Sequence, residues 1–404
     1  MKYWPRLSSR MVSGLISSNA RQKRWAGVLH PAFLALASAA TFAHAVWYTL
    51  FPIYLRSSAP LELWQVGIIS SLTLTLSFVL ALPAGVVADA ISTRTALILA
   101  SAGQTAALLL IPLALHPLPL LASVATYTFC LTLRGQVSLR LLAASSVRRS
   151  WGSTYSVYLL LTGASNVIGS YLSGPLAERK GFGTVYLVSA VLFLLTLPFS
   201  YLVERVPGNS GRRAVRNLKA LQDGSFARLT ASLALHDLAV FSASSYVQIF
   251  QREIVGLSPS HISLLTAIGS AASQAAQLGA GYFADRFGAR KALALHYLGV
   301  SAGYAVMGIG DSFEDLLVAT LVQSAFLPFD MPARRKLLSL MAPESAVATI
   351  NGLSDAVVGL VSLPSPLLGG WLWYCVGPRG MLAACAALNL MAFLPLARLR
   401  DGSE

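Results

Sequence analysis

Residues 281–291, GYFADRFGARK, form a charged, glycine-rich stretch between two long apolar runs. An earlier stretch, GVVADAISTRT at 85–95, repeats its pattern at an offset of 196 residues. Over 85–103 against 281–299, eight of nineteen positions are identical, whereas chance in an apolar-biased chain would give about two. The same ungapped offset pairs Arg56 with Arg252, Gly163 with Gly359, and Gly174 with Gly370. The chain is therefore predicted to consist of two halves with the same internal order.

The composition is that of a membrane protein. Of the 404 residues, 55% are hydrophobic and 11% are charged, against roughly 25% charged in a soluble domain. About twelve apolar segments reach the roughly 20 residues that a bilayer-spanning helix needs, and the alternating pattern of a β-barrel does not appear. We predict an all-α polytopic membrane protein with about twelve transmembrane helices in two pseudo-symmetric six-helix bundles. The predicted spans are 30–55, 62–88, 94–115, 118–143, 153–177, 182–203, 228–252, 260–284, 290–310, 315–340, 346–371 and 377–397.

The basic residues report topology. The net charge is +14, and the excess lies in the N-terminal tail, a central linker and every second break between apolar segments. The positive-inside rule then places both termini and the linker in the cytoplasm. This distribution argues against nucleic-acid binding and for contact with anionic membrane lipids. The expected units are a cytoplasmic tail at 1–29, an N-terminal bundle at 30–204, a linker at 205–227, a C-terminal bundle at 228–398 and a short tail at 399–404.

The repeated stretch resembles the loop signature of the major facilitator superfamily, which joins helices 2 and 3 and recurs between helices 8 and 9. The second copy carries Gly281, Asp285, Arg286, Gly288, Arg290 and Lys291, and the first keeps Gly85, Asp89 and Arg94. The resemblance implies a gate in which Asp285 pairs with Arg290, and Asp89 with Arg94, on the cytoplasmic side. Its glycines should let two helices approach closely. The alternative is a helix-capping turn that only sets topology.

Other segments extend the resemblance over residues 30–398. SSVRRSWGSTYSV at 145–157 resembles the family's basic loop before helix 5. Glycine–proline patterns of helices 5 and 11, expected to pack helices together, are matched by Gly174, Pro175, Pro366, Gly369 and Gly370. The antiporter form of the helix 5 pattern wants glycines where Leu161 and Ser170 stand, so drug/proton antiport is a hypothesis.

Two charged residues are expected deep in the membrane, where each costs at least about 2.5–3.5 kcal/mol to insert. Arg134 lies about 21 Å from the boundary marked by Arg148, too far for its head group to reach the surface. Asp330 is its repeat equivalent and stands between Pro328 and Pro332. We assign both to substrate binding or coupling. The alternative is an Arg134–Asp330 ion pair that only holds the halves together.

Further polar residues fall on helices 1, 4 and 7, which the resemblance places around a central cavity. His44, His236 and Asp237 are candidates to carry a coupling proton, because histidine and a carboxylate in a low-dielectric site can titrate near neutral pH. For His44 the alternative is a structural hydrogen bond to a backbone carbonyl. Gln136 and Gln248 could bind substrate, although contacts between helices are the commoner role of such residues.

These features predict a secondary transporter that works by alternating access, with proton-coupled export of small amphipathic organic compounds as the first hypothesis. Its partners would be a small-molecule substrate, protons or another coupling ion, and membrane lipids, and we expect a monomer in the inner or plasma membrane. No phosphate loop, metal-ligand cluster or nucleophile–base set appears, so an enzyme, a metal or a cofactor is not expected. The alternatives are uptake or facilitated transport of a small polar or anionic metabolite, and a membrane sensor or channel that transports nothing by alternating access.

Overall fold

A computed structural model describes residues 31–399, apart from residues 60, 115–116, 146–150, 204, 207–223 and 342–346. All regular structure in these residues is helical. The first half comprises α2 (Pro31–Tyr48), α3 (Phe51–Ser57), α4 (Leu63–Val79), α5 (Ala81–Ala90), α6 (Thr93–Leu110), η1 (Ile111–Leu113), α7 (Pro117–Ser145), α8 (Trp151–Lys180) and α9 (Phe182–Leu202). The second half comprises α10 (Gly224–Ser244), α11 (Val247–Glu253), α12 (Pro259–Phe287), α13 (Ala289–Ile309), α14 (Phe313–Phe326), η3 (Leu327–Phe329), α15 (Asp330–Leu340), α16 (Val347–Ser362), α17 (Ser365–Met391) and α18 (Phe393–Ala397).

Helix length and composition fit a membrane-spanning protein. Among the described residues, six helical stretches are long and apolar enough to cross a membrane, and the bent pair α4 and α5 would be a seventh. One of the six, Ile350–Ala397, has 48 residues, about twice what one crossing requires. It contains Gly377 with φ of 77°, a backbone angle that glycine adopts without strain. The chain turns there, between the predicted spans 346–371 and 377–397.

The two halves repeat individual hydrogen bonds at the 196-residue offset. In each case a basic side chain donates to a backbone carbonyl, and the donor and the acceptor in the second half are both 196 residues after those in the first half. The equivalent pairs are Arg56 to Leu61 and Arg252 to Leu257, Arg94 to Val203 and Arg290 to Leu399, and Arg140 to Ala88 and Lys336 to Ala284. The internal repeat seen in the sequence is therefore also a repeat of tertiary contacts.

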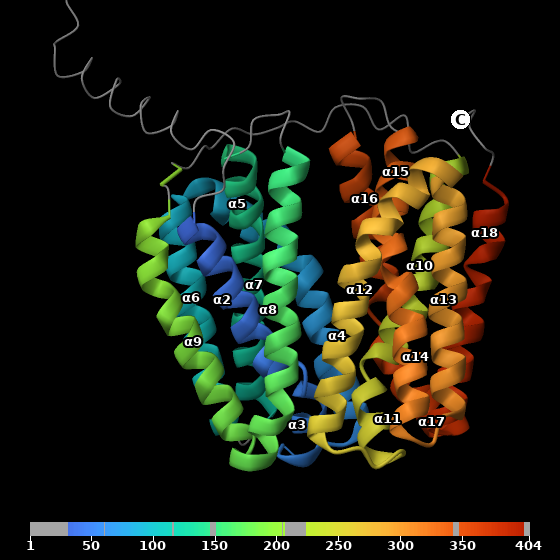
Figure 1. The fold of residues 1–404 in the computed structure, drawn as a ribbon, viewed down its shortest axis with the longest axis horizontal. Helices are drawn as coiled ribbons and strands as arrows, with labels where there is room; N and C mark the ends of the chain where they lie inside the picture. The colour runs from blue at the N-terminus through green and yellow to red at the C-terminus, as the bar shows by residue number, and fades with distance from the viewer. Residues whose placement is uncertain are drawn as a thin grey trace, which may run out of the picture.

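Figure 1 shows α2–α9 (blue to green) beside α10–α18 (yellow to red). Across the boundary, α8 packs on α12, α4 on α16 and α17, and α3 on α11. Glycines allow close helix packing both across this boundary and within a half. A Cβ on Gly174 would meet backbone atoms of Pro259 and Ser260 on α12, in the other half. A Cβ on Gly369 would meet the Ser242 carbonyl within the second half. A side chain at these positions would force the helices apart.

The halves are joined by polar contacts at the end of the molecule that carries α3 and α11, the lower end in Figure 1. We call it the α3/α11 end. Arg56 pairs with Glu253 at 2.8 Å. The Glu178 carboxylate on α8 accepts hydrogen bonds from the Ser260 hydroxyl and backbone N–H on α12, at 2.6 and 2.9 Å. These hydrogen bonds favour the charged form, so they hold the pKa of Glu178 below its usual value.

The loop signature forms different contacts from those expected. Asp285 pairs with Lys336 of α15 at 3.0 Å instead of with Arg290, whose guanidinium donates to the Leu399 and Ala397 carbonyls at the end of α18. Arg94 likewise donates to the Val203 carbonyl. The reason is geometric: each arginine starts a new helix and points toward the end of the last helix in its own half. In this state Asp285 thus contacts Lys336 and Arg290 contacts the end of α18, and the gate remains a prediction.

The glycines of the signature also differ from expectation. A Cβ on Gly85 or Gly281 would meet no atom within 4 Å, so neither residue permits the close helix approach that we predicted. Gly288 ends α12 with φ of 97°, which a residue with a side chain adopts only with strain. Arg286 lies over the Tyr282 and Phe287 rings, and Lys291 is exposed. Of the basic loop at 145–157, residues 146–150 lie outside the described residues.

Candidate functional site

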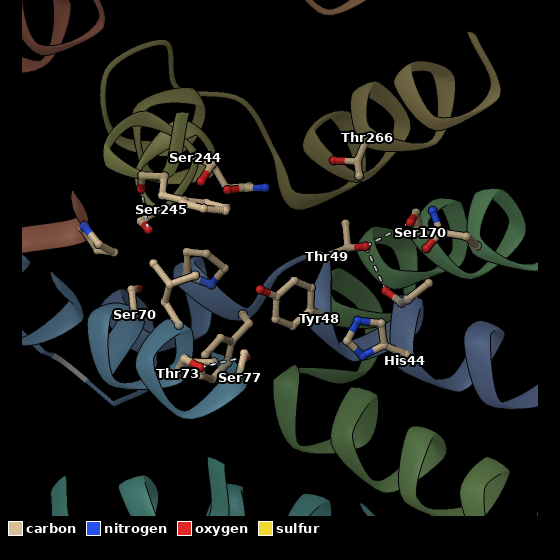
Figure 2. Close-up of a pocket in the computed structure, with 18 residues that line it drawn as sticks. His44, Tyr48, Thr49, Ser70, Thr73, Ser77, Ser170, Ser244, Ser245 and Thr266 are labelled. Atoms are coloured by element: carbon tan, nitrogen blue, oxygen red, sulfur yellow. Dashed lines mark hydrogen bonds between the residues drawn. The ribbon is translucent and has the colours of Figure 1, made fainter. Parts of the chain in front are cut away.

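A central cavity of about 390 Å³ lies between the halves. Residues of both halves line it, and most carry hydroxyl, amide or aromatic groups. They include Tyr48 of α2, Thr49 just after it, Ser70, Thr73 and Ser77 of α4, Asn166 and Ser170 of α8, Ser244 of α10, Gln248 of α11, Thr266 of α12 and Pro366 of α17. Figure 2 shows Tyr48 in the middle of these groups, with the α4 hydroxyls on one side and Ser170 on the other.

Most cavity hydroxyls already donate within their own helix. Thr73, Ser77 and Thr266 each donate to the carbonyl four residues earlier, at 2.8 to 3.0 Å. Their oxygens keep lone pairs that face the cavity as acceptors. Asn166 of α8 donates to Ser270 of α12 at 3.2 Å, a hydrogen bond that crosses between the halves. The cavity therefore presents acceptors in a ring around Tyr48.

A second cavity of about 350 Å³ extends the first between α8, α11, α12 and α14. The two share Asn166, Gln248 and Thr266 as lining residues. The Gln248 Oε1 atom is buried and has no hydrogen-bond partner among the described residues. Within the part of the chain that the structure describes, neither cavity is lined by aspartate, glutamate, lysine or arginine. This space suits an uncharged solute with polar groups.

His44 connects the central cavity with a smaller pocket. Its Nδ1 lies 2.6 Å from the Tyr127 hydroxyl, and its ring stacks on Tyr48 at 4.7 Å between centroids. The partner of His44 is thus a tyrosine hydroxyl, and not the backbone carbonyl that the alternative interpretation predicted. The smaller pocket, about 140 Å³, is lined by His44 and Arg134. His44 therefore sits between the aromatic part of the cavity and a buried cation.

Arg134 is 7% exposed. Its guanidinium donates to Gln104 Oε1 and the Ser101 hydroxyl of α6, at 2.8 to 3.0 Å, and lies over the Phe193 ring at 5.6 Å. Its Nη1 has no partner among the described residues. All of these contacts are neutral, so the charge is uncompensated by any carboxylate in the described part of the chain.

Asp330 does not pair with Arg134. Arg334, one helical turn further on, bonds to Asp330 through its Nε at 3.1 Å and to both Asp237 oxygens at 2.8 and 3.3 Å. The expected pair across the halves was therefore wrong, because a nearer arginine satisfies both carboxylates inside the second half. Sequence reasoning missed Arg334, although its spacing four residues after Asp330 is a recognised ion-pair spacing on a helix.

The other predicted residues divide between two places. Gln248 lines both cavities, whereas Gln136 of α7 is not among the residues that line either of them. His236 lies in the second half against Asn389 and His296, next to the Asp237–Arg334–Asp330 cluster. The hydroxyl groups of α4 escaped sequence reasoning because serine and threonine are common in membrane helices.

Comparison with known proteins gives the family. A family model described as Major Facilitator Superfamily matches residues 32–254 and 229–403. The chain belongs to the major facilitator superfamily. With its long apolar helices, this makes it a multi-pass membrane protein.

Similar proteins share the fold at low identity. An uncharacterized MFS-type transporter of Methanocaldococcus jannaschii is 26% identical over 245 residues, which cover 57% of this chain and 60% of the relative. Among solved structures, the nucleoside transporter NupG has a TM-score of 0.74 at 12% identity, covering 92% of this chain and 99% of its own. A bacterial homolog of the human lysosomal transporter Spinster, in an inward-facing and occupied conformation, has a TM-score of 0.74 at 14% identity and covers 91% and 95%. At such identities these structures show the fold alone.

Proposed function

We propose that this protein is a secondary transporter that exports small, amphipathic, uncharged organic compounds by alternating access, driven by protons. The observation that carries the proposal is the central cavity, which both halves line with hydroxyl, amide and aromatic groups and with no aspartate, glutamate, lysine or arginine among the described residues. A charged solute placed there would lose its hydration without gaining a counter-ion. An uncharged one could stack on Tyr48 and donate to the surrounding acceptors.

The position of the polar contacts suggests which state is seen. Arg56–Glu253 and Glu178–Ser260 join the halves at the α3/α11 end. We propose that this end faces the outside, since the basic breaks predict that the opposite end and both termini are cytoplasmic. The structure would then represent a state whose outer side is shut. Rocking of the halves about the cavity would have to break these contacts.

Transport of uncharged solutes is tested in proteoliposomes by counterflow with a panel of neutral, cationic and anionic compounds. Tyr48→Ala should raise the half-saturation concentration roughly 2- to 13-fold, because an aromatic contact contributes about 0.5–1.5 kcal/mol beyond its buried area. Tyr374→Ala is the matched control, since that ring is on α17 and 90% exposed. Counterflow of charged solutes alone, or equal effects of the two variants, would contradict the proposal.

Proton coupling is proposed for the buried acidic cluster of the second half. Asp237 of α10 pairs with Arg334 of α15, so protonation of Asp237 would loosen the contact between α10 and α15. Protonation of Asp330 would instead break the ion pair that Asp330 makes with Arg334 within α15. Asp330→Asn should abolish uphill transport under an imposed pH gradient while downhill counterflow remains. Unchanged accumulation by this variant would exclude Asp330 from coupling.

A second candidate substrate is an anionic metabolite, and Arg134 favours it. This buried cation has an Nη1 without a partner among the described residues and lines a pocket next to His44. A carboxylate of a substrate could complete its hydrogen bonds. Arg134→Gln separates the candidates: a weaker binding of anions, measured by thermal shift, supports the second, and unchanged binding of neutral solutes supports the first.

A further inference from the structure

Two histidines face each other inside the second half. His236 of α10 and His296 of α13 are 4% and 1% exposed, and their Nε2 atoms are 3.0 Å apart. This separation is that of a hydrogen bond between two ring nitrogens. One of the two nitrogens must therefore carry the hydrogen.

In each ring, the hydrogen-bond partner of the other nitrogen, Nδ1, shows whether that nitrogen carries a hydrogen. The His236 Nδ1 lies 2.6 Å from Asn389 Oδ1. The Asn389 amide is oriented by its NH₂ group, which donates to the Tyr297 carbonyl and to the Ser301 hydroxyl, so its oxygen faces His236. Because an amide oxygen only accepts, His236 Nδ1 must be protonated.

The same holds for His296. Its Nδ1 lies 3.0 Å from the Phe326 carbonyl oxygen, which also only accepts, so this nitrogen is protonated as well. A neutral imidazole carries one N–H. If both rings were neutral, both Nε2 atoms would present lone pairs to each other at 3.0 Å, which is repulsive.

We propose that His236 and His296 form a proton-binding site that holds one additional proton between their two Nε2 atoms. With that proton the pair is a single cation, and each of the four ring nitrogens has a hydrogen-bond partner. Without it, the Nε2···Nε2 contact would have to break.

The charged surroundings fit one added positive charge. The groups that face the pair are Asp237 on α10, and Asp330 and Arg334 on α15, with His236 Nε2 3.9 Å from Asp237 Oδ1. The neutral partners are Tyr297 on α13, which stacks on His236, and Asn389 on α17. Two carboxylates and one guanidinium leave one negative charge, which a single proton on the histidine pair neutralises. A neutral cluster costs least to bury in a membrane.

A divalent cation fits less well. The two imidazoles and Asp330 offer atoms within 4.8 Å of one another. However, tetrahedral zinc with Zn–N distances of 2.0–2.1 Å needs nitrogens about 3.3–3.4 Å apart, wider than the 3.0 Å seen. A doubly charged ion would also leave the cluster with a net positive charge beside Arg334.

The site belongs to one half of the repeat. At the 196-residue offset, His236 and His296 correspond to Ala40 and Ala100 of the first half, and Asp330 corresponds to Arg134. The first half thus has a permanent cation where the second has a carboxylate and a proton site. If the proposed proton coupling holds, this pair is a further proton-binding group beside Asp237 and Asp330, and loss of its proton would leave the cluster with one negative charge.

Nitrogen-15 NMR tests the site directly on the full-length protein in detergent micelles, with all six histidines labelled. At pH 8, well above the ordinary imidazole value of about 6.5, we expect one pair of ring nitrogens from two residues to be coupled through a shared proton. His296→Asn should abolish that coupling. His261→Asn should leave it intact, because His261 contacts Ser258 and Phe313 away from the pair.

Two results would overturn the assignment. One is a spectrum in which both Nε2 atoms are unprotonated at pH 8. The other is a stoichiometric metal, detected by elemental analysis, whose removal by a chelator changes the two rings. Transport bears on a different question: a wild-type protein without proton-driven transport would refute the proposed coupling and leave the shared proton standing. Proton-driven transport without the shared proton would refute this site alone.

Discussion

Replacing Gly174 by alanine should shift the protein away from the state described here. Gly174 lies on α8 at the α3/α11 end, where an added Cβ would meet the Ser263 hydroxyl, the Pro259 carbonyl and the Ser260 Cα of α12. Two of these three atoms belong to the backbone, so no side-chain rotation relieves the clash. Overpacking of this kind costs about 1–3 kcal/mol. The cost falls on the state in which α8 and α12 meet at this end.

A penalty of that size changes the population ratio of two states by roughly 5- to 150-fold. Spin labels at Ser58, after α3, and Ile254, after α11, report the separation of the halves by double electron–electron resonance. Cys375 is exposed and must first be replaced by serine. In Gly174→Ala the longer distances should gain population at the expense of the short ones.

Gly281→Ala is the matched control, because it makes the same change on α12 where a Cβ would meet nothing within 4 Å. It should leave the distance distribution unchanged. If Gly174→Ala also leaves it unchanged, or if both variants shift it equally, the close α8–α12 approach does not hold the halves together and the reasoning fails.

Three further outcomes follow from single contacts. The Glu178–Ser260 contact stabilises the state in which the α3/α11 end is shut. This stabilisation is present above the ordinary glutamate pKa and is lost as pH falls through the lowered pKa of Glu178. Acid should therefore increase the distance between the same spin labels, and Glu178→Gln should remove this pH dependence. Arg334→Gln leaves two buried carboxylates unpaired and should cost about 3–5 kcal/mol; its melting temperature in detergent should fall far more than that of Arg335→Gln, whose ion pair has side chains that are 40% and 37% exposed. Gly288→Ala should cost about 1–3 kcal/mol, because its φ is 97°; a melting temperature equal to that of the parent would contradict this strain.

Much of the candidate site could not have been found in the sequence. Charged residues in apolar segments stand out, so Arg134, Asp237 and Asp330 were identified as unusual. Their partners were not, because a side chain's contacts depend on how helices rotate against each other. Arg334 looked like one of several basic residues at a membrane boundary, yet it forms ion pairs with both carboxylates. His296 sits among apolar residues on α13 and gained significance only when α10 placed His236 opposite it.

The helical class and the twofold repeat needed no structure, because they depend on composition and on a pattern that recurs along the chain. Long apolar segments must form helices to satisfy their backbone in lipid, and the repeated pattern keeps glycines and charges at a constant offset of 196 residues. Only the tertiary structure showed which groups meet. It showed a cavity without arginine, lysine or carboxylate groups among its described lining residues. It also showed that Asp237 and Asp330 both pair with Arg334, and that the Nε2 atoms of His236 and His296 are in contact. Charge and hydrogen-bond complementarity act over a few ångströms in space, and residues 60 to 153 positions apart in the chain meet at that distance only after the helices have packed.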